Sequence, residues 1–336
     1  MIRAWLPWKT RLVFRRGFTL LELVVVMAIL ALLAGIAIRS FDGLDQQARF
    51  DATRRSMQNI DDAILATSRE ADGSLSITGF IADVGRLPQA FGADPNSQLA
   101  ELWSNPRNLA PFVVQTSPSD PQVLIACGWR GNYLRLGVGQ STLQDGWGNA
   151  FDLLKSDLAT AVGNGDAIAA IRSRGADGMI DTGPTTGYNA DITLMLGGAG
   201  SPTSLGGTAT ISGNVYQFDA TTGQLGNPDT TKGDVTIMFF GPNPNTGLIL
   251  DPPVSVTLTY NSSAWVVKSY VGQQPTVTPT GTTVSFSFVG TAGPRVIRAY
   301  QGTPTIPGNW STAPLLSVPV RVTLQPGGQA KDLTLR

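Results

Sequence analysis

One apolar stretch near the N-terminus limits what this chain can fold into. After Arg15-Arg16 and Gly17, residues 18–38 form an apolar run of 21 residues in which Glu22 is the single charge. As a helix, this run would be about 31 Å long, enough to cross the hydrocarbon core of a bilayer. A carboxylate in such a segment costs insertion energy unless it is paired, so Glu22 is a candidate functional residue. We predict a helix that lies in a membrane or in the core of a filament.

The junction Arg-Arg-Gly-Phe with a nearby glutamate resembles the N-terminus of the type IV pilin and type II secretion pseudopilin superfamily. The resemblance implies that a prepilin peptidase cuts after Gly17 and that the new N-terminal residue, Phe18, is methylated. Glu22 then holds the fifth place of the mature chain. The resemblance further implies that Glu22 pairs with the terminal amine of a neighbouring subunit. Such pairing removes an uncompensated charge from an apolar medium and favours one axial register.

Three other interpretations of the same segment compete with this one. The first is a cleaved secretory signal with a small-x-small site at 35–37. The second is a twin-arginine export signal, suggested by Arg15-Arg16. The third is a plain membrane anchor. The apolar core of a signal rarely carries an acid, and an anchor gives no reason for Gly17, Phe18 and Glu22 to coincide.

The distribution of charge predicts the orientation of the chain. Residues 1–17 contain five basic residues and no acid, which places this leader in the cytoplasm by the positive-inside rule. We therefore expect a single-pass protein of the bacterial inner membrane, with its head in the periplasm or on an extracellular filament. Without the leader, 19 basic and 24 acidic residues remain, a side-chain charge of −5. This charge does not favour nucleic-acid binding.

The composition also excludes several kinds of chemistry. Histidine is absent, which rules out histidine triads, histidine metal sites and histidine acid–base catalysis. Cys127 is the one cysteine, so no intramolecular disulfide can form, and we predict that it is a small buried core residue. We find no nucleophile elbow and no phosphate-binding loop. The sequence therefore predicts a protein that is not an enzyme.

The pattern along the chain predicts an α+β fold with a long N-terminal helix, a small pilin-like α+β head and an all-β antiparallel sandwich. Seven short alternating runs between residues 234 and 335 indicate the sandwich. Its ending, residues 320–335, looks like the transthyretin-like type. The predicted segments are a prepilin leader (1–17), a transmembrane and assembly helix (18–70), a pseudopilin-like head (71–228) and the sandwich (229–336).

Three patches resemble the major pseudopilin of type II secretion. They are Gly-Arg-Leu-Pro at 85–88 with Leu-Ala-Glu-Leu-Trp at 99–103, Asp-Gly-Trp-Gly-Asn-Ala-Phe at 145–151, and a Gly-rich loop over 173–192. In that family the loop holds calcium, which prefers six to eight oxygen ligands. By resemblance Asp177 and Asp191 would be side-chain ligands, and Asn189 stands where the family often has aspartate. The alternative is that these residues only make turns and caps.

Together these observations predict a structural pilin-like subunit. We expect it to be processed by prepilin peptidase and assembled with other pilin-like subunits by an inner-membrane platform. The product would be a type II secretion pseudopilus or a type IV pilus-like filament. One alternative is a minor or tip subunit, or an adhesin, whose sandwich binds a partner. Another is an exported soluble binding protein with a cleaved signal, which the mature N-terminus would distinguish.

Overall fold

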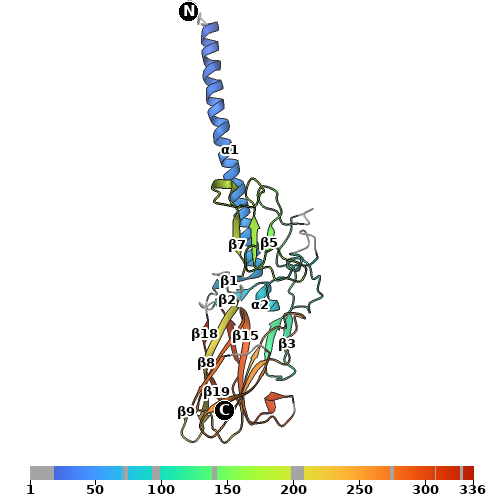
Figure 1. Cartoon of the computed structure of the whole chain (residues 1–336), viewed down its shortest axis with the longest axis vertical. Helices are drawn as coiled ribbons and strands as arrows, with labels where there is room; N and C mark the ends of the chain where they lie inside the picture. Colours follow the sequence, from blue (N-terminus) through green and yellow to red (C-terminus); the bar gives the residue numbers. More distant parts are fainter. Residues whose placement is uncertain are drawn as a thin grey trace, which may run out of the picture. The chain divides into compact units, whose positions relative to one another are not determined.

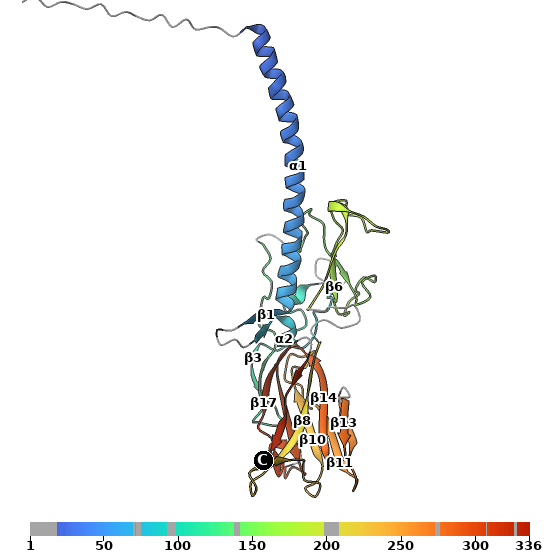
Figure 2. The same ribbon diagram turned by 90° about the vertical axis from the view of Figure 1, so that its left-hand side faces the viewer.

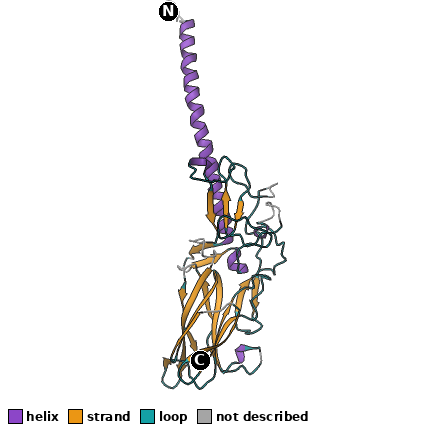
Figure 3. Ribbon diagram, viewed as in Figure 1, coloured by secondary structure: helices purple, strands orange, loops and turns teal. Residues whose placement is uncertain are grey.

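The structure is a computed structural model. It describes residues 19–69, 71, 75–92, 99–137, 142–197, 208–272, 276–306, 308–325 and 328–336. The chain divides into two compact units, residues 1–48 and residues 49–336. Helix dominates the described part of the first unit, whereas strands and loops make up most of the second (Figure 3). The structure is consistent with the predicted α+β class.

The long helix α1, Leu20–Ile64, contains 45 residues. It is shorter than the helix predicted for 18–70, because the following residues form strand β1, Ala66–Arg69, which pairs with β2, Leu75–Thr78. Gly79 has a φ of +112°, and a Cβ there would lie 2.7 Å from the carbonyl oxygen of Ile64. The chain can turn back against the helix end only because this residue has no side chain.

The second half of α1 packs on the head through one apolar stripe. Met57, Ile60 and Ile64 recur at helical spacing, and all three are buried in one core cluster. Strands β5, β6 and β7 form an antiparallel three-stranded sheet that contributes to this cluster. The elements of the head are α2 (Phe80–Val84), η1 (Ala100–Leu102), β3 (Val113–Thr116), β4 (Leu124–Cys127), β5 (Asp152–Leu154), β6 (Ala170–Ser173), η2 (Gly187–Asn189) and β7 (Ile192–Met195).

The two segments of the first patch that resembles the major pseudopilin, 85–88 and 99–103, contact each other in the structure. The Arg86 guanidinium donates to both carboxylate oxygens of Glu101, at 2.6 and 2.7 Å. Glu101 is buried, and Arg107 lies 2.8 Å from the same carboxylate. The indole N–H of Trp129 donates to the backbone oxygen of Glu101 at 3.0 Å. This buried cluster fixes the segment that follows α2 against η1.

Two six-stranded sheets form the C-terminal part of the chain, which we call the two-sheet region (residues 208–336; Figures 1 and 2). One sheet has the order β12-β11-β10-β15-β16 with β17 also on β15. The other has the order β13-β14-β8-β18 with β9 and β19 also on β8. Their elements are β8 (Thr208–Asp219), β9 (Gln224–Gly226), β10 (Val235–Phe240), β11 (Val254–Tyr260), β12 (Trp265–Val271), β13 (Thr276–Thr280), β14 (Thr283–Thr291), β15 (Gly293–Gln301), η3 (Trp310–Thr312), β16 (Leu315–Leu316), β17 (Val320–Leu324), β18 (Gln329–Ala330) and β19 (Leu333–Leu335).

The inner faces of the two sheets share one core. Ile237 and Ile297 from the first sheet, and Ile211 and Phe286 from the second, belong to the same buried cluster. The seven alternating runs predicted from the sequence coincide with β10, β11, β12, β14, β15, β17 and β19. The sheets are not wholly antiparallel as predicted, because β18 and β19 run parallel to β8.

The structure moves the boundary predicted between head and sandwich at 228/229. Strand β8 lies on the head side of that boundary, yet it pairs with β14 over eight residues and also carries β9, β18 and β19. Asp229, at the predicted boundary, also bonds to both sheets: its backbone N–H donates to Gln217 Oε1 at 2.7 Å, and Gln301 Nε2 donates to its backbone oxygen at 2.6 Å. A cut after residue 228 would remove the central strand of the second sheet.

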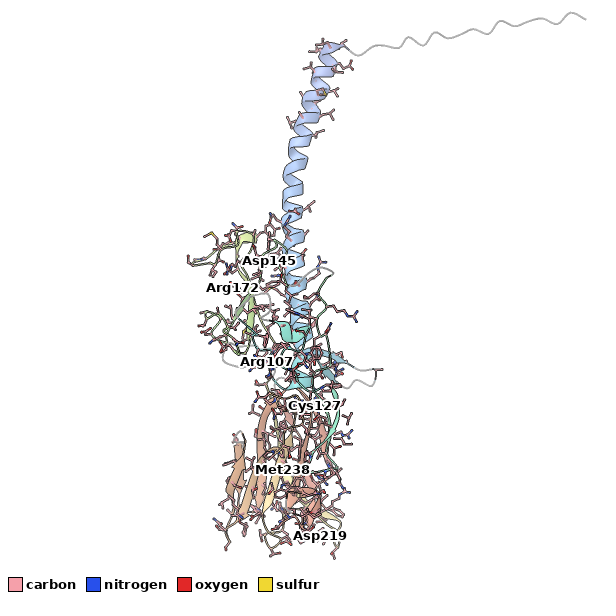
Figure 4. All side chains as sticks on the ribbon, turned by 90° about the vertical axis from the view of Figure 1, so that its right-hand side faces the viewer. Arg107, Cys127, Asp145, Arg172, Asp219 and Met238 are labelled. Carbon is pink, nitrogen blue, oxygen red and sulfur yellow. The ribbon has the colours of Figure 1, made fainter. Side chains whose placement is uncertain are left out.

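The hairpin of β3 and β4 covers the outer face of the first sheet. Ile125 and Cys127 of β4 share a buried cluster with Met238, Val296 and Tyr300 of the two-sheet region. Figure 4 labels Cys127 and Met238, two members of this cluster. The head and the two-sheet region therefore have a common core and form one structural unit, not two separable domains.

Candidate functional site

The first turn of α1 contains the predicted assembly residue, Glu22. Its backbone N–H donates to Thr19 Oγ1, with 3.2 Å between nitrogen and oxygen. Thr19 precedes the helix and Glu22 is the third helical residue, which is the spacing of a capping box. A carboxylate in the first turn also interacts favourably with the helix dipole. The Glu22 carboxylate thus suits the start of a helix, whereas the capping bond itself uses only the backbone N–H of this residue. The Thr-x-x-Glu spacing is visible in the sequence, but our sequence reasoning overlooked Thr19.

The predicted processing residues, Gly17 and Phe18, lie outside the described residues. Directly after them, every large apolar side chain of α1 from Leu20 to Leu33 is exposed, with Leu20 82% and Leu32 67% exposed. A helix that is apolar all round needs a cover of lipid or protein.

No helix in the described part of the chain combines the length and hydropathy needed to cross a membrane. The membrane span predicted over 18–38 is therefore not confirmed.

A turn at residues 145–149 fastens the head to the second half of α1. The Asp145 carboxylate accepts from the backbone N–H groups of Trp147 and Asn149, at 3.0 and 2.8 Å. Gly146 N–H donates to Thr53 Oγ1 of α1 at 2.8 Å. A Cβ at Gly146 would overlap the backbone of Arg49, so only glycine permits this approach. The second patch that resembles the major pseudopilin is therefore a helix-docking turn.

The loop predicted to bind calcium joins β6 to β7. Asp181 and Asp191 exchange hydrogen bonds: each backbone N–H donates to the other's carboxylate, at 3.2 and 2.8 Å. Asp177 is exposed, and its Oδ1 accepts from Met179 N–H at 3.0 Å. Asn189 is exposed, and its backbone oxygen lies 2.6 Å from where a Cβ on Gly175 would be. The loop is closed by hydrogen bonds between its own backbone and side chains.

One atom in this loop is unsatisfied. Asp191 Oδ1 is buried and has no hydrogen-bond partner in the structure, whereas Oδ2 faces Arg172 Nε at 3.8 Å. An orphaned buried carboxylate oxygen fits a missing ligand or water. However, no group of three or more Asp, Glu, Cys or His residues in the described part of the chain is arranged to hold a metal ion. The structure pairs Asp181 with Asp191 and leaves Asp177 engaged in a local turn.

A second charged cluster lies beside this loop. Asp152 of β5 accepts hydrogen bonds from Arg172 at 2.9 Å and from Arg174 at 2.6 Å. Burial opposes ionisation of Asp152, but the hydrogen bonds from Arg174 and Arg172 outweigh it and lower the pKa of the carboxyl. Figure 4 labels Arg172 and Asp145, both on this part of the head. The cluster stabilises the pairing of β5 with β6.

Cys127 is buried and free, as the sequence predicts. Burial raises the pKa of its thiol to about 11, while the nearby Arg295 acts to lower it. Arg295 itself is fully buried, and this burial lowers its pKa to about 10. Its guanidinium donates to the backbone oxygens of Ala82, at 3.1 Å, and Ala292, at 2.9 Å. A thiol this weakly acidic is a core residue, not a nucleophile.

Comparison with known proteins identifies the N-terminal segment. Residues 14–38 match the family described as "Prokaryotic N-terminal methylation motif". This motif indicates a type IV pilin-like protein that prepilin peptidase processes and that assembles with other pilin subunits. It contains Gly17, Phe18 and Glu22, the residues on which the sequence resemblance rests.

The remaining comparisons add nothing to this. No curated protein matches the chain. Among solved structures, a leucine-rich repeat protein from Bacteroides thetaiotaomicron VPI-5482 matches with 11% identity and a TM-score of 0.19. The match covers 39% of this chain and 12% of that protein. At such a TM-score the likeness carries no argument about fold or function.

Proposed function

We propose that the protein is a structural pseudopilin-like subunit of a type II secretion pseudopilus or a type IV pilus-like filament. The observation that carries this proposal is the methylation motif at 14–38, which leads into a helix whose apolar side chains are all exposed from Leu20 to Leu33. Such a helix is stable only when lipid or the helices of other subunits cover it. Assembly provides that cover.

The proposal includes a location and a set of partners. The protein is anchored in the bacterial inner membrane by a single pass. It is handed to the filament by the inner-membrane assembly platform, with its head in the periplasm or on an extracellular filament. Its role is structural and not enzymatic. The two-sheet region is a β-sandwich of the transthyretin-like type, a proposal supported by the ending over 320–335 and by the shared core of its two sheets.

Glu22 has a specific role in this proposal. After cleavage, the α-amine of Phe18 is a cation at the edge of an apolar medium. The Glu22 carboxylate of an incoming subunit pairs with that amine of its neighbour, and the pairing sets the axial register. The Thr-x-x-Glu spacing of a capping box and the helix dipole offer a competing, purely local reason for the glutamate. The two roles can be separated by substitution.

The test uses Glu22→Gln and Thr19→Ala. Glutamine keeps the capping-box geometry but removes the charge, whereas Thr19→Ala removes the cap and keeps the charge. We expect Glu22→Gln to reduce the protein in the sheared filament fraction at least tenfold, the factor that about 1.4 kcal/mol corresponds to. Thr19→Ala should assemble nearly as well as the unmodified chain. Membrane insertion of both variants, measured by carbonate extraction, is the control.

The opposite pattern would contradict the pairing role. If Glu22→Gln assembles normally while Thr19→Ala does not, assembly needs the cap at the start of the helix and does not need the charge of Glu22. A minor or tip subunit is the second candidate function, favoured by a groove of about 550 Å³ between the β3–β4 hairpin and strands β15 and β17 that is suited to a partner. Quantifying the protein against the other subunits of purified filaments distinguishes a tip component, present in few copies, from a major one.

A further inference from the structure

A groove of about 550 Å³ lies between the β3–β4 hairpin and strands β15 and β17. It is distinct from the N-terminal motif and from the 175–191 loop. The residues that line it include Val114, Leu124 and Ala126 of the hairpin, Val296 of β15, and Arg321 and Thr323 of β17. The groove therefore runs between elements from opposite halves of the chain.

Strand β17, which lines one side of the groove, is the last strand at its end of the sheet. Strand β17 pairs with β15 along one edge, and no strand in the described part of the chain pairs with its other edge. The Thr323 carbonyl on β17 accepts from the side chain of Gln329 at 2.7 Å, so a side chain occupies one position where a neighbouring strand could bond. Backbone groups on such an edge are a template for an added strand.

The opposite side of the groove is an apolar wall. Val114 is 66% exposed and Leu124 is 38% exposed, although their neighbours Ile125 and Cys127 on the same hairpin are buried in the core. The hairpin thus turns one face to the core and keeps its other face apolar in solvent. An exposed apolar face beside a free strand edge is suited to alternate side chains of an extended peptide.

The charged residues that line the groove indicate the kind of partner that it binds. Its lining contains two arginines and no acidic residue. Arg295 is satisfied internally by backbone oxygens of Ala82 and Ala292. Arg321 is exposed and makes no hydrogen bond or ion pair with any residue that the structure describes. An unpaired guanidinium prefers a carboxylate, which it can bind with two parallel hydrogen bonds.

We propose that this groove binds an extended acidic peptide segment of a partner protein. The segment adds a strand to the free edge of β17, places its apolar side chains against Val114 and Leu124, and sets a carboxylate beside Arg321. None of the residues that line the groove belongs to α1.

The experiment measures peptide binding to the full chain in detergent by fluorescence anisotropy. The probe is a short labelled peptide in which Val and Thr alternate and the central Val is replaced by Glu. Two matched peptides carry Lys at that place, or keep the Glu but have N-methylated backbone amides. We expect the Glu peptide to bind at least about tenfold more tightly than either of the others.

Variants of the protein test the residues. Arg321→Glu should abolish binding of the Glu peptide and favour the Lys peptide, and Val114→Asp should weaken binding of the Glu peptide. Lys331→Glu is the matched control, because Lys331 is exposed and does not line the groove. The proposal is overturned if the Glu peptide does not bind, if charge or N-methylation makes no difference, or if Arg321→Glu binds like the control variant. Circular dichroism of each variant checks that it is folded.

Discussion

The carboxylate of Asp120 and the guanidinium of Arg298 form a buried ion pair that joins the β3–β4 connection to strand β15. Their side chains are 0% and 1% exposed. The Tyr300 hydroxyl donates to the same carboxylate at 2.5 Å, and Gln122 accepts from Arg298 at 2.7 Å. Burial, together with the hydrogen bond to Asp120, raises the pKa of Tyr300 well above its usual value. This network fastens the hairpin to the two-sheet region.

Asp120→Asn should therefore destabilise the protein strongly. It leaves the Arg298 charge buried without a counter-charge, which costs about 3 to 5 kcal/mol of unfolding free energy. The matched control is Asp234→Asn in the Lys268–Asp234 pair, whose side chains are 58% and 30% exposed. That change should cost less than about 1 kcal/mol. Urea unfolding measures both. Equal costs would show that the buried pair contributes no more than a surface one.

Residues 233–336 expressed alone should not fold cooperatively. The fragment lacks β8, the strand that carries β14, β18 and β19, and it exposes Met238 and Val296, which the β3–β4 hairpin covers. We expect aggregation or a broad thermal transition. Residues 49–336 contain all three core clusters and should unfold in a single transition. A sharp transition for 233–336 would show that these residues fold without β8 and without the β3–β4 hairpin.

The strands of the two-sheet region show which parts of the fold can be predicted from the sequence and which cannot. Strands such as β14 and β17 can be recognised in the sequence because one buried face gives a period of two. Strand β8 was missed because Gly213 interrupts its pattern and because the preceding segment is rich in glycine and serine. The pairing of Asp120 with Arg298 has no local signal, since the two residues lie 178 positions apart. Contacts of this kind depend on the completed fold.

Some features of the candidate site can likewise be predicted from the sequence, whereas others depend on the fold. Glu22 stands out because a charge inside an apolar run is visible without a structure, and so is the Thr19 spacing that we overlooked. The loop residues Asp177, Asn189 and Asp191 share a composition that suits calcium. Composition could not reveal that Asp191 bonds with Asp181, because this exchange depends on the way the loop closes.

Asp152→Asn should lower stability in a pH-dependent way. Because the folded pKa of Asp152 is lowered, its ionised form stabilises the protein above its unfolded pKa of about 3.9, and this contribution is lost as the pH falls through the folded value. We expect a loss of about 1 to 3 kcal/mol near neutral pH, typical of hydrogen bonds to charged groups. The loss should shrink below about pH 4. Urea unfolding across this range measures it, and a loss that does not vary with pH would contradict the assignment.

Calcium binding at the 175–191 loop is a proposal supported by the unpaired Asp191 Oδ1. If the ion binds there, calcium at 100 times its dissociation constant adds about 2.7 kcal/mol of stability and raises the melting temperature. Asp191→Asn and Asp177→Ala should remove most of that rise, while Asp219→Asn, in a turn of the two-sheet region, should not. A melting curve of the unmodified protein that chelator leaves unchanged would show that internal hydrogen bonds alone hold the loop.

The central claim is that the chain is processed as a pilin-like subunit, and the mature N-terminus tests it most directly. Mass spectrometry of the protein isolated from the membrane or filament fraction of its native cells should find a chain that begins with N-methylated Phe18. That result follows from the Gly17-Phe18 junction within the methylation motif at 14–38. A mature chain that begins at Ile38, just after the small-x-small site at 35–37, would show a cleaved secretory signal and contradict the account.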